Sequence, residues 1–272
     1  MWKKLLNCSV VTLILVIGLL VVSIMVLDGV AQSAIESKGS EGLGVRVKVE
    51  NVHVGFFNSD SNISGIIIEN PASFQTDETL NMLTIKKASV EFNIFQMFQK
   101  EVVIPVVDIE GVVLNLQQDA HQSNIETIIE HVSSDETPES AHPEPPFNIE
   151  TLIIRDITVI ARGKFTVLES GPITAHIKEI TMHNIGTDGD VEVATEAITA
   201  AVTHAIMEHL ADHPVEGFSK LAFSHVTGLI NQLPVFKQLG IGDVVQGAAD
   251  TIGKGIDGIL GGIGDLLEGG KN

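Results

Sequence analysis

The stretch that decides the fold runs from residue 45 to residue 129 and holds four segments rich in β-branched residues. They read VRVKVENVHV (45–54), GIIIENPASF (65–74), LNMLTIKKASVEF (80–92) and EVVIPVVDIEGVVLNL (101–116). Val45, Val47 and Val49 alternate with polar residues, which is the period of a half-buried strand. Continuous apolar runs such as residues 66–68 favour strands that are covered on both faces. This stretch therefore predicts a β-sheet.

The alternation of apolar residues changes phase at three places along the chain. A slip of one residue sends the following side chains to the opposite face unless a β-bulge absorbs it. Two interpretations remain open, namely bulged strands in a bent sheet, or the end of one strand and the start of the next. The slips fall between Val49 and Val52, between Ile85 and Ala88, and between Ile177 and Ile180.

Composition excludes several classes of function. The 272-residue chain has a net charge of −19, so it has no basic surface to neutralise nucleic acid or to dock on anionic lipid headgroups. Aromatic residues make up 4% of the chain, and there is no Tyr, so strong aromatic anchors for a protein interface are scarce. Cys8 is the single cysteine, which rules out an intramolecular disulfide.

Residues 5–27 form an almost continuous apolar segment, long enough for a helix that crosses a bilayer. Lys3 and Lys4 precede it and Asp28 follows it. The positive-inside rule then predicts a single-pass membrane protein with its N-terminus in the cytoplasm and the rest of the chain across the membrane. A cleaved signal peptide is the alternative, although its apolar region is normally shorter. The predicted anchor residues include Leu5, Leu13, Ile17, Leu20 and Leu27.

Four further segments complete the predicted domain organisation. Residues 28–38 continue the anchor, as part of a unit 1–38, in a short helix that Gly39, Gly42 and Gly44 end. Ser123 and Glu126 resemble a capping box for a helix over residues 124–131. The acidic, proline-rich segment 133–147 has no apolar periodicity and predicts a solvated loop. An acidic partner-binding motif or a Ca²⁺ site is the alternative, although the carboxylates lack the fixed spacing of a calcium loop. The sheet domain is predicted to span residues 45–186.

The second half of the sheet is predicted from strands at residues 149–154, 157–161, 164–168 and 173–182. FNIETLIIRDITVIARG (147–163) echoes EVVIPVVDIEGVVLNLQ (101–117), which suggests repeated strand-turn-strand units in one antiparallel sheet. The acidic residues at the expected turns or strand ends are explained by turn chemistry. They are Asp108, Glu110, Asp156 and Asp188.

The C-terminal third of the chain changes to a helical period. Residues 193–210 predict an amphipathic helix and residues 218–233 a second helix, so that a helical unit over residues 191–233 covers one sheet face. The Gly-rich tail, residues 239–272, carries an apolar stripe that is too rich in Gly to form a stable helix alone. It therefore needs a surface, which is the body of the protein, a second copy or a bilayer interface. Taken together, the predicted segments indicate an α+β fold with a transmembrane helix, a curled, mainly antiparallel sheet and C-terminal amphipathic helices.

None of the motifs GxSxG, Walker A, GxGxxG after a strand, CxxC and HExxH occurs in the chain. His209 and His213 lie four residues apart, with His204 and Glu208 nearby, which is a spacing that can bind zinc. They also stand at the end of a predicted helix, where His interacts with the helix dipole. The prediction is therefore a protein that is not an enzyme and has no catalytic residues, no metal site and no cofactor.

A series of short motifs follows the predicted anchor in a fixed order along the first half of the chain. They are Asn70-Pro71 with Phe74, Ile94-Phe95, Val102-Val103, Ile109 with Gly111, Leu116, and Ser123-Asn124-Ile125. In the order and type of these elements the chain resembles the AsmA-like family of bacterial envelope proteins. The resemblance covers residues 1–129, and more weakly the chain to residue 186.

The resemblance implies an inner-membrane protein that faces the periplasm of a diderm bacterium. Family members look like curled sheets with an apolar groove and are related to chorein-type bridge-like lipid transporters. Large members are associated with phospholipid movement, but this chain is too short to span the periplasm as a monomer. The resemblance implies no active-site residues. The groove that it suggests would be lined by Ile67, Val90, Phe92, Val103, Val107 and Leu114.

Two functions follow from these expectations. The first is an anchored periplasmic protein that binds acyl chains of phospholipids or assists lipid traffic and outer-membrane biogenesis. The second is a non-catalytic scaffolding protein, whose tail binds envelope proteins or another copy. The apolar runs of the sheet serve either as a closed core or as a lipid groove, and sequence alone leaves that choice open.

Overall fold

The computed structural model describes residues 27–55, 60–76, 79–91, 102–134, 147–167, 171–186, 194–213, 215–233 and 236. The predicted anchor apart from Leu27, the groove residue Phe92, most of the acidic loop and the Gly-rich tail lie outside these residues. Among the described residues, no helix has the length and apolarity needed to cross a membrane.

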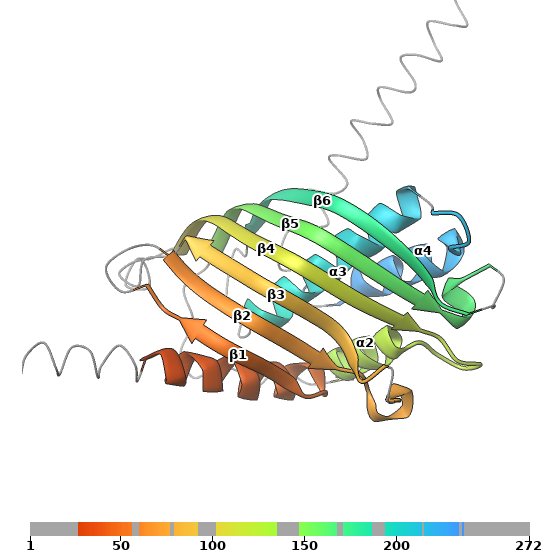
Figure 1. Cartoon of the computed structure of the whole chain (residues 1–272), viewed down its shortest axis with the longest axis horizontal. Helices are drawn as coiled ribbons and strands as arrows, with labels where there is room; N and C mark the ends of the chain where they lie inside the picture. The colour runs from red at the N-terminus through yellow and green to blue at the C-terminus, as the bar shows by residue number, and fades with distance from the viewer. Residues whose placement is uncertain are drawn as a thin grey trace, which may run out of the picture.

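A six-stranded open sheet, in the order β1-β2-β3-β4-β5-β6, forms the body of the protein (Figure 1). Every neighbouring pair is antiparallel except β4 and β5, which run parallel. The α+β class with a mainly antiparallel sheet is therefore confirmed. The strands are β1 (Val47–His53), β2 (Asp60–Glu69), β3 (Asn81–Glu91), β4 (Val102–Gln117), β5 (Phe147–Arg162) and β6 (Ile173–Gly186).

The two segments that echo each other in sequence are neighbouring strands. β4 and β5 are each one continuous strand of 16 residues, so the predicted strand-turn-strand units are wrong. Asp108 and Glu110 lie within β4 and Asp156 lies within β5, away from any turn, and Asp188 is outside the described residues. A parallel pair needs a long crossover, and here the chain passes through α2 (Asn124–Ser134) and the acidic loop. The strand predicted at 164–168 is instead the end of a 3-10 turn, η3 (Gly163–Phe165), and an isolated bridge at Thr166.

All three phase slips lie on one row that crosses the whole sheet. The strands run through the slips without a break, so the strand-end interpretation is wrong. The pairing register is also the same on both sides of the row, so no strand is bulged there, and the one register shift in the described sheet lies between Ile68 and Glu69. We call this row the crease. It consists of Glu50, Gly65, Lys86, Gly111, Asp156 and Lys178.

Backbone conformation explains how the crease switches the faces of the sheet. Gly65, Gly111 and Asp156 have φ of 65°, 71° and 52°, in the left-handed region that Gly enters freely and Asp tolerates. Two successive residues of each neighbouring strand then point outward, as the exposed Lys86 and Lys87 do. The apolar residues next to the crease all face inward on both sides of it. One row is Val49, Ile66, Ile85, Val112, Ile157 and Ile177, and the other is Val52, Ile63, Ala88, Ile109, Ile154 and Ile180.

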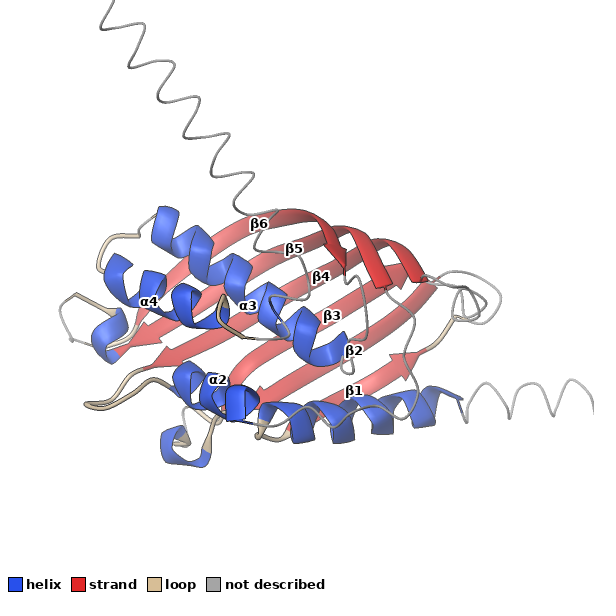
Figure 2. Ribbon diagram, turned by 180° about the vertical axis from the view of Figure 1, so that it is seen from behind, coloured by secondary structure: helices blue, strands red, loops and turns tan. Residues whose placement is uncertain are grey.

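Helices cover the concave face and one edge of the sheet (Figure 2). α2, α3 (Ala194–Asp212) and α4 (Lys220–Ile230) lie over the concave face, as predicted for the C-terminal helices. A helix over residues 27–43 runs along β1. It continues through Gly39 and Gly42, which were expected to end it, and stops before Gly44, whose φ of 66° fits a helix C-terminus.

The capping box at the start of α2 is confirmed. The Ser123 backbone N–H donates to Glu126 Oε2 at 2.5 Å, and the Glu126 N–H donates to Ser123 Oγ at 3.2 Å. These two bonds satisfy N–H groups that a helix N-terminus leaves without partners. The helix continues to Ser134, one turn beyond the predicted end.

Candidate functional site on the concave face and the sheet edges

The concave face of the sheet is filled by the protein's own side chains. Leu114, Leu152 and Val159 are 0% exposed, and the apolar residues of the strands form one cluster with those of α2, α3 and α4. Residues 201–207 of α3 are all buried, and seven successive residues cover every side of a helix. α3 is therefore a core helix, and the predicted amphipathic pattern does not hold over these two turns.

A small apolar cavity lies between α2, α3 and the end of α4. Its volume is about 40 Å³, and its lining is almost entirely apolar. A cavity of about 150 Å³ is known to hold benzene, so this one has no room for an acyl chain as it stands. It is lined by Leu43, Met82, Ile125, Ile128, Ile129, Val132, Thr199, Ala200, Thr203, Ile230 and Leu233.

The residues predicted to line a groove divide between the two faces of the sheet. Val90, Val107 and Leu114 face inward and belong to the core cluster or pack against it. Ile67 pairs with the exposed Lys48, and Val103 pairs with Asn148, so both point to the outer face. The predicted single groove lining is therefore wrong, because the crease and a second irregular row, Pro105, Glu150 and Asn184, change which residues face inward. Pro105 lies within β4 beside β5, and the described pairing of β4 with β3 ends two residues away, at Val107.

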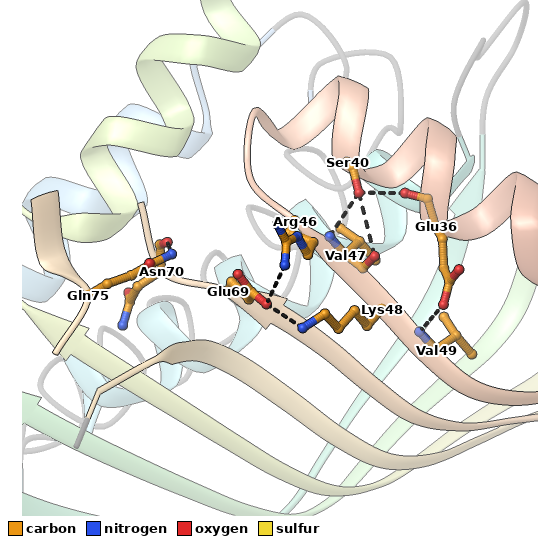
Figure 3. A network of polar contacts seen from close by, with 9 residues as sticks. All are labelled: Glu36, Ser40, Arg46, Val47, Lys48, Val49, Glu69, Asn70 and Gln75. Atoms are coloured by element: carbon orange, nitrogen blue, oxygen red, sulfur yellow. Dashed lines mark hydrogen bonds and ion pairs between the residues drawn. The ribbon is translucent and has the colours of Figure 1, made fainter. Parts of the chain in front are cut away.

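The helix over residues 27–43 is bonded to the free edge of β1 at each of its turns. The backbone N–H of Val49 donates to Glu36 Oε1 at 2.8 Å, and Gln32 Nε2 donates to the Val49 carbonyl at 2.6 Å. The Val47 N–H donates to Ser40 Oγ at 2.9 Å (Figure 3). An edge strand exposes unpaired backbone groups that would otherwise bind another strand. Here side chains of the helix take the place of that strand.

The spacing of these side chains is the signal that sequence reasoning missed. Asp28, Gln32, Glu36 and Ser40 recur every four residues, so they form one stripe along the helix. Asp28 Oδ1 accepts a hydrogen bond from the backbone N–H of Val54 at 2.8 Å, just beyond the end of β1. The stripe was visible in the sequence as a polar i, i+4 repeat, but it carried no indication of which backbone it would meet. We call it the edge ladder.

A buried carboxylate lies beside the edge ladder, at the end of β2. Glu69 is 8% exposed and pairs with Lys48 at 2.6 Å and with Arg46 at 3.8 Å (Figure 3). Burial of an unpaired charge costs free energy of folding. The two cations offset this cost for the Glu69 carboxylate. Both cations come from β1 or its start. The arrangement therefore joins β1 to β2 and offers no free carboxylate for chemistry.

Residues that carried the family resemblance meet in a buried polar cluster. Asn124 Nδ2 donates to Asn70 Oδ1 at 2.7 Å and to the Asn115 carbonyl at 2.8 Å. Asn124 Oδ1 accepts from the backbone N–H groups of Gln117 and Ile125. Every polar atom of the Asn124 side chain is thus paired. The cluster fixes the start of α2 against the ends of β2 and β4, which is a structural role.

The histidines near the end of α3 differ in their surroundings. His204 is 1% exposed, its ring lies 4.5 Å from that of Phe236, and burial lowers its pKa to about 4. Burial also raises the pKa of Glu208, whose Oε2 lies 4.0 Å from His204 Nδ1. The rings of His209 and His213 stack, with 4.7 Å between their centroids. In the part of the chain that the structure describes, no group of three His, Cys, Asp or Glu side chains could hold a metal ion.

The outer face of the sheet carries an ion-pair group near the crease. Arg155 pairs with Asp108 and, at 3.1 Å, with Glu179. The hydrogen bonds that Arg155 donates to Glu179 and then to Asp108 raise the pKa of Arg155. The group joins β4, β5 and β6 on a solvated surface. It lies on the opposite side of the sheet from the side chains that line the described cavity.

Comparison with known proteins leaves the function to be argued from geometry. No family model, no curated protein and no solved structure matches the chain.

Proposed function

We propose that this chain is a non-catalytic structural protein of a bacterial envelope, tethered to the inner membrane by residues 5–27 and carrying its sheet on the periplasmic side. It acts as a rigid, membrane-anchored scaffold, which we call the tethered mount, and it binds other proteins or copies of itself through the sheet or through the Gly-rich tail. This proposal develops the scaffolding alternative that the sequence suggested.

The edge ladder is the observation that carries the proposal. Asp28 directly follows the apolar segment, and the helix from residue 27 to residue 43 is bonded to β1 from its first turn to its last. A flexible tether would need no such bonds. A helix that is fixed to a sheet edge transmits the orientation of the anchor to the body, which suits a mount.

The filled concave face supports the same proposal. A lipid carrier of the curled-sheet type needs an apolar trough that stays open to an acyl chain. Here α2, α3 and α4 occupy that face, and the cavity among them measures about 40 Å³. The sheet therefore uses its apolar surface for its own stability.

Membrane topology provides the direct test. The full chain with a C-terminal epitope tag is expressed in a diderm bacterium, and membranes are washed with carbonate at high pH. We expect the tag to stay with the membrane pellet, and to be removed by protease added to spheroplasts but not to intact cells. Release into the soluble periplasmic fraction, or protection in spheroplasts, would contradict the tethered mount.

The tail has a separate test. The chain that lacks residues 239–272 is compared with the full chain by pull-down from mildly solubilised membranes. Loss of a partner, or a change in oligomer size, assigns assembly to the tail. An unchanged set of partners and an unchanged size would remove the tail from the proposal.

Acyl-chain binding is the second candidate, and the apolar cavity favours it. The cavity is bounded by separate elements, namely α2, α3, the end of α4 and Leu43 of the first helix, so a small shift of α3 would enlarge it. Native mass spectrometry of the full chain in mild detergent would then detect bound phospholipid. Ala200→Met fills the cavity and should remove that lipid, whereas Ala222→Met on α4 leaves the cavity lining unchanged. A wild-type protein that is free of lipid would exclude this candidate.

A further inference from the structure

The two edges of the sheet differ in a way that the tethered mount does not explain. β1 is covered by the edge ladder, whereas β6 is the last strand of the sheet on the other side. Among the described residues, no strand pairs with the outer edge of β6, and no side chain bonds to the backbone there. Exposed backbone groups of an edge strand are a template for another strand. β6 is 14 residues long, so this edge is extensive.

The crease gives β6 a pattern that restricts which strand fits beside it. Ile177 and Ile180 face inward, whereas Lys178 and Glu179 between them both face outward and are exposed. A neighbouring strand keeps its side chains on matching faces only if its own outward pair lies beside this one. A strand whose apolar and polar residues alternate without a break cannot match β6 on both sides of the crease. On one side its apolar residues would point to the solvated face of the sheet.

We propose that β6 pairs antiparallel with β6 of a second copy of this chain, about a twofold axis between Lys178 and Glu179. In this register Lys178 of each copy lies opposite Glu179 of the other, and Ile177 lies opposite Ile180. The faces match over residues 174–183. The remaining pairs across the interface are Ala175 with Met182, His176 with Thr181, and Thr174 with His183.

Charge complementarity selects this register. The twofold axis forms the Lys178–Glu179 pair twice, and directly opposed charges of opposite sign stabilise paired strands. A second register also matches the faces, because Asn184, with φ of 55°, marks the other irregular row. That register places Lys178 opposite Asn184 and Glu179 opposite His183, so it forms no pair of permanent opposite charges.

The pairing closes on itself at two copies. An isologous contact uses the same surface on both chains, and the remaining edge of each sheet is β1. The edge ladder covers that edge in both copies, so no third chain can add a strand. The product is one continuous sheet with a covered edge at each end.

This inference goes beyond the proposed function, and either can fail alone. The topology experiment tests the mount without reference to the oligomeric state. The experiment below uses the full chain in mild detergent, with two different affinity tags on co-expressed copies.

Charge reversal in two separate chains is the decisive test. Lys178→Glu gives a chain with two acidic residues at the axis, and Glu179→Lys gives a chain with two basic residues. In a dimer of either variant alone, like charges face each other across the axis. We therefore expect the dimer dissociation constant of each variant to rise about tenfold or more. When the two variants are co-expressed, each acidic pair faces a basic pair, and co-purification of the two tags should return to the wild-type level.

Two controls separate this contact from other routes to association. Glu50→Lys reverses the same charge on the same crease, but at the covered edge, so it should leave the dimer unchanged. Circular dichroism of every variant checks that the sheet is folded. Amide exchange over residues 173–186 should also slow as the wild-type protein is concentrated, which association through the tail would not produce.

The outcomes are distinct. Loss in each single variant with recovery in the mixture supports the proposed register. A wild-type protein that is monomeric at micromolar concentration overturns the proposal, as does a dimer that both single variants leave intact. Loss in the single variants without recovery in the mixture also overturns it, because the pairing would then not depend on opposite charges at the axis.

Discussion

Asn124 Nδ2 donates a 2.7 Å hydrogen bond to Asn70 Oδ1, which joins two residues 54 positions apart in sequence. Both side chains are almost completely buried, at 0% and 1% exposure. The bond ties the end of β2 to the start of α2, the helix that begins the crossover from β4 to β5. The contact therefore helps to fix where the crossover to the parallel strand begins.

Replacement of Asn124 should be among the most damaging single changes in the protein. Asn124→Leu leaves Asn70 Oδ1, the Asn115 carbonyl and the Gln117 N–H without these partners. Each buried group that loses its partner costs about 1–3 kcal/mol, so we expect a loss of about 3–5 kcal/mol in the free energy of unfolding. Urea unfolding in mild detergent measures it, and the exposed Asn51→Leu on β1 is the control. Equal stability of the two variants would show that the cluster contributes little.

The edge ladder should stabilise the protein and protect the backbone amides of β1 from hydrogen exchange. Glu36→Leu removes the acceptor of the Val49 N–H, and we expect a loss of about 1–2 kcal/mol and faster amide exchange at Val49. Glu36→Gln keeps an acceptor oxygen and should lose less. Glu41→Leu lies on the same helix but away from the strand backbone, so it should leave exchange at Val49 unchanged. Protection at Val49 that survives Glu36→Leu would argue against the ladder.

Glycine at the crease should be required, unlike glycine in a helix. Gly111 has φ of 71°, and a Cβ built on it would lie 2.7 Å from Cβ of Lys86. Gly111→Ala should therefore lower the free energy of unfolding by about 1–3 kcal/mol. Gly228 lies in α4 with nothing within 4 Å of a built Cβ, so Gly228→Ala should instead add up to about 1 kcal/mol. Thermal unfolding of the two variants gives the comparison, and shifts of the same sign would contradict it.

Acid should destabilise the protein through His204. The pKa of His204 is lowered from 6.5 to about 4, so the folded state holds the neutral ring. The unfolded chain binds the proton first as pH falls, and the stability present above pH 6.5 is lost between 6.5 and 4. This difference between the pKa of His204 in the unfolded and folded states corresponds to a loss of about 3 kcal/mol in the free energy of unfolding at pH 4. The raised pKa of Glu208 acts in the opposite sense, because protonation of its carboxyl in the folded state adds stability as pH falls.

His204→Leu provides the check on that assignment. The variant should lose most of the decrease in stability between pH 7 and pH 4, as measured by urea unfolding at a series of pH values. The exposed His121→Gln should keep the wild-type pH dependence. If both variants follow the wild-type curve, His204 does not account for the acid sensitivity.

Local patterns predicted much of this fold. The phase slips at Val49, Ile85 and Ile177, the capping box at Ser123 and the helical period after residue 193 are all contained within short windows. The alignment of the slips in one row is different, because it depends on the register between strands that are distant in sequence. The parallel pairing of β4 with β5 is also non-local, since the acidic loop that follows α2 does not specify where the chain rejoins the sheet.

The candidate site was less predictable for the same reason. Ile67 and Val103 look like groove residues in sequence because they stand in continuous apolar runs. Whether each points inward depends on its position relative to the crease and to the row through Pro105. The edge ladder was visible as a spacing of four residues, but its partner, the backbone of β1, has no sequence signature.

The edge ladder also determines how many copies can assemble. In polymer chemistry, a monomer with one reactive end stops at a pair, whereas a monomer with two reactive ends grows into a chain. The helix that covers β1 makes this protein a monomer of the first kind. A substitution that releases the helix from Val47 and Val49 would therefore do more than weaken the fold. It would supply a second reactive edge and convert a self-limiting pair into a filament.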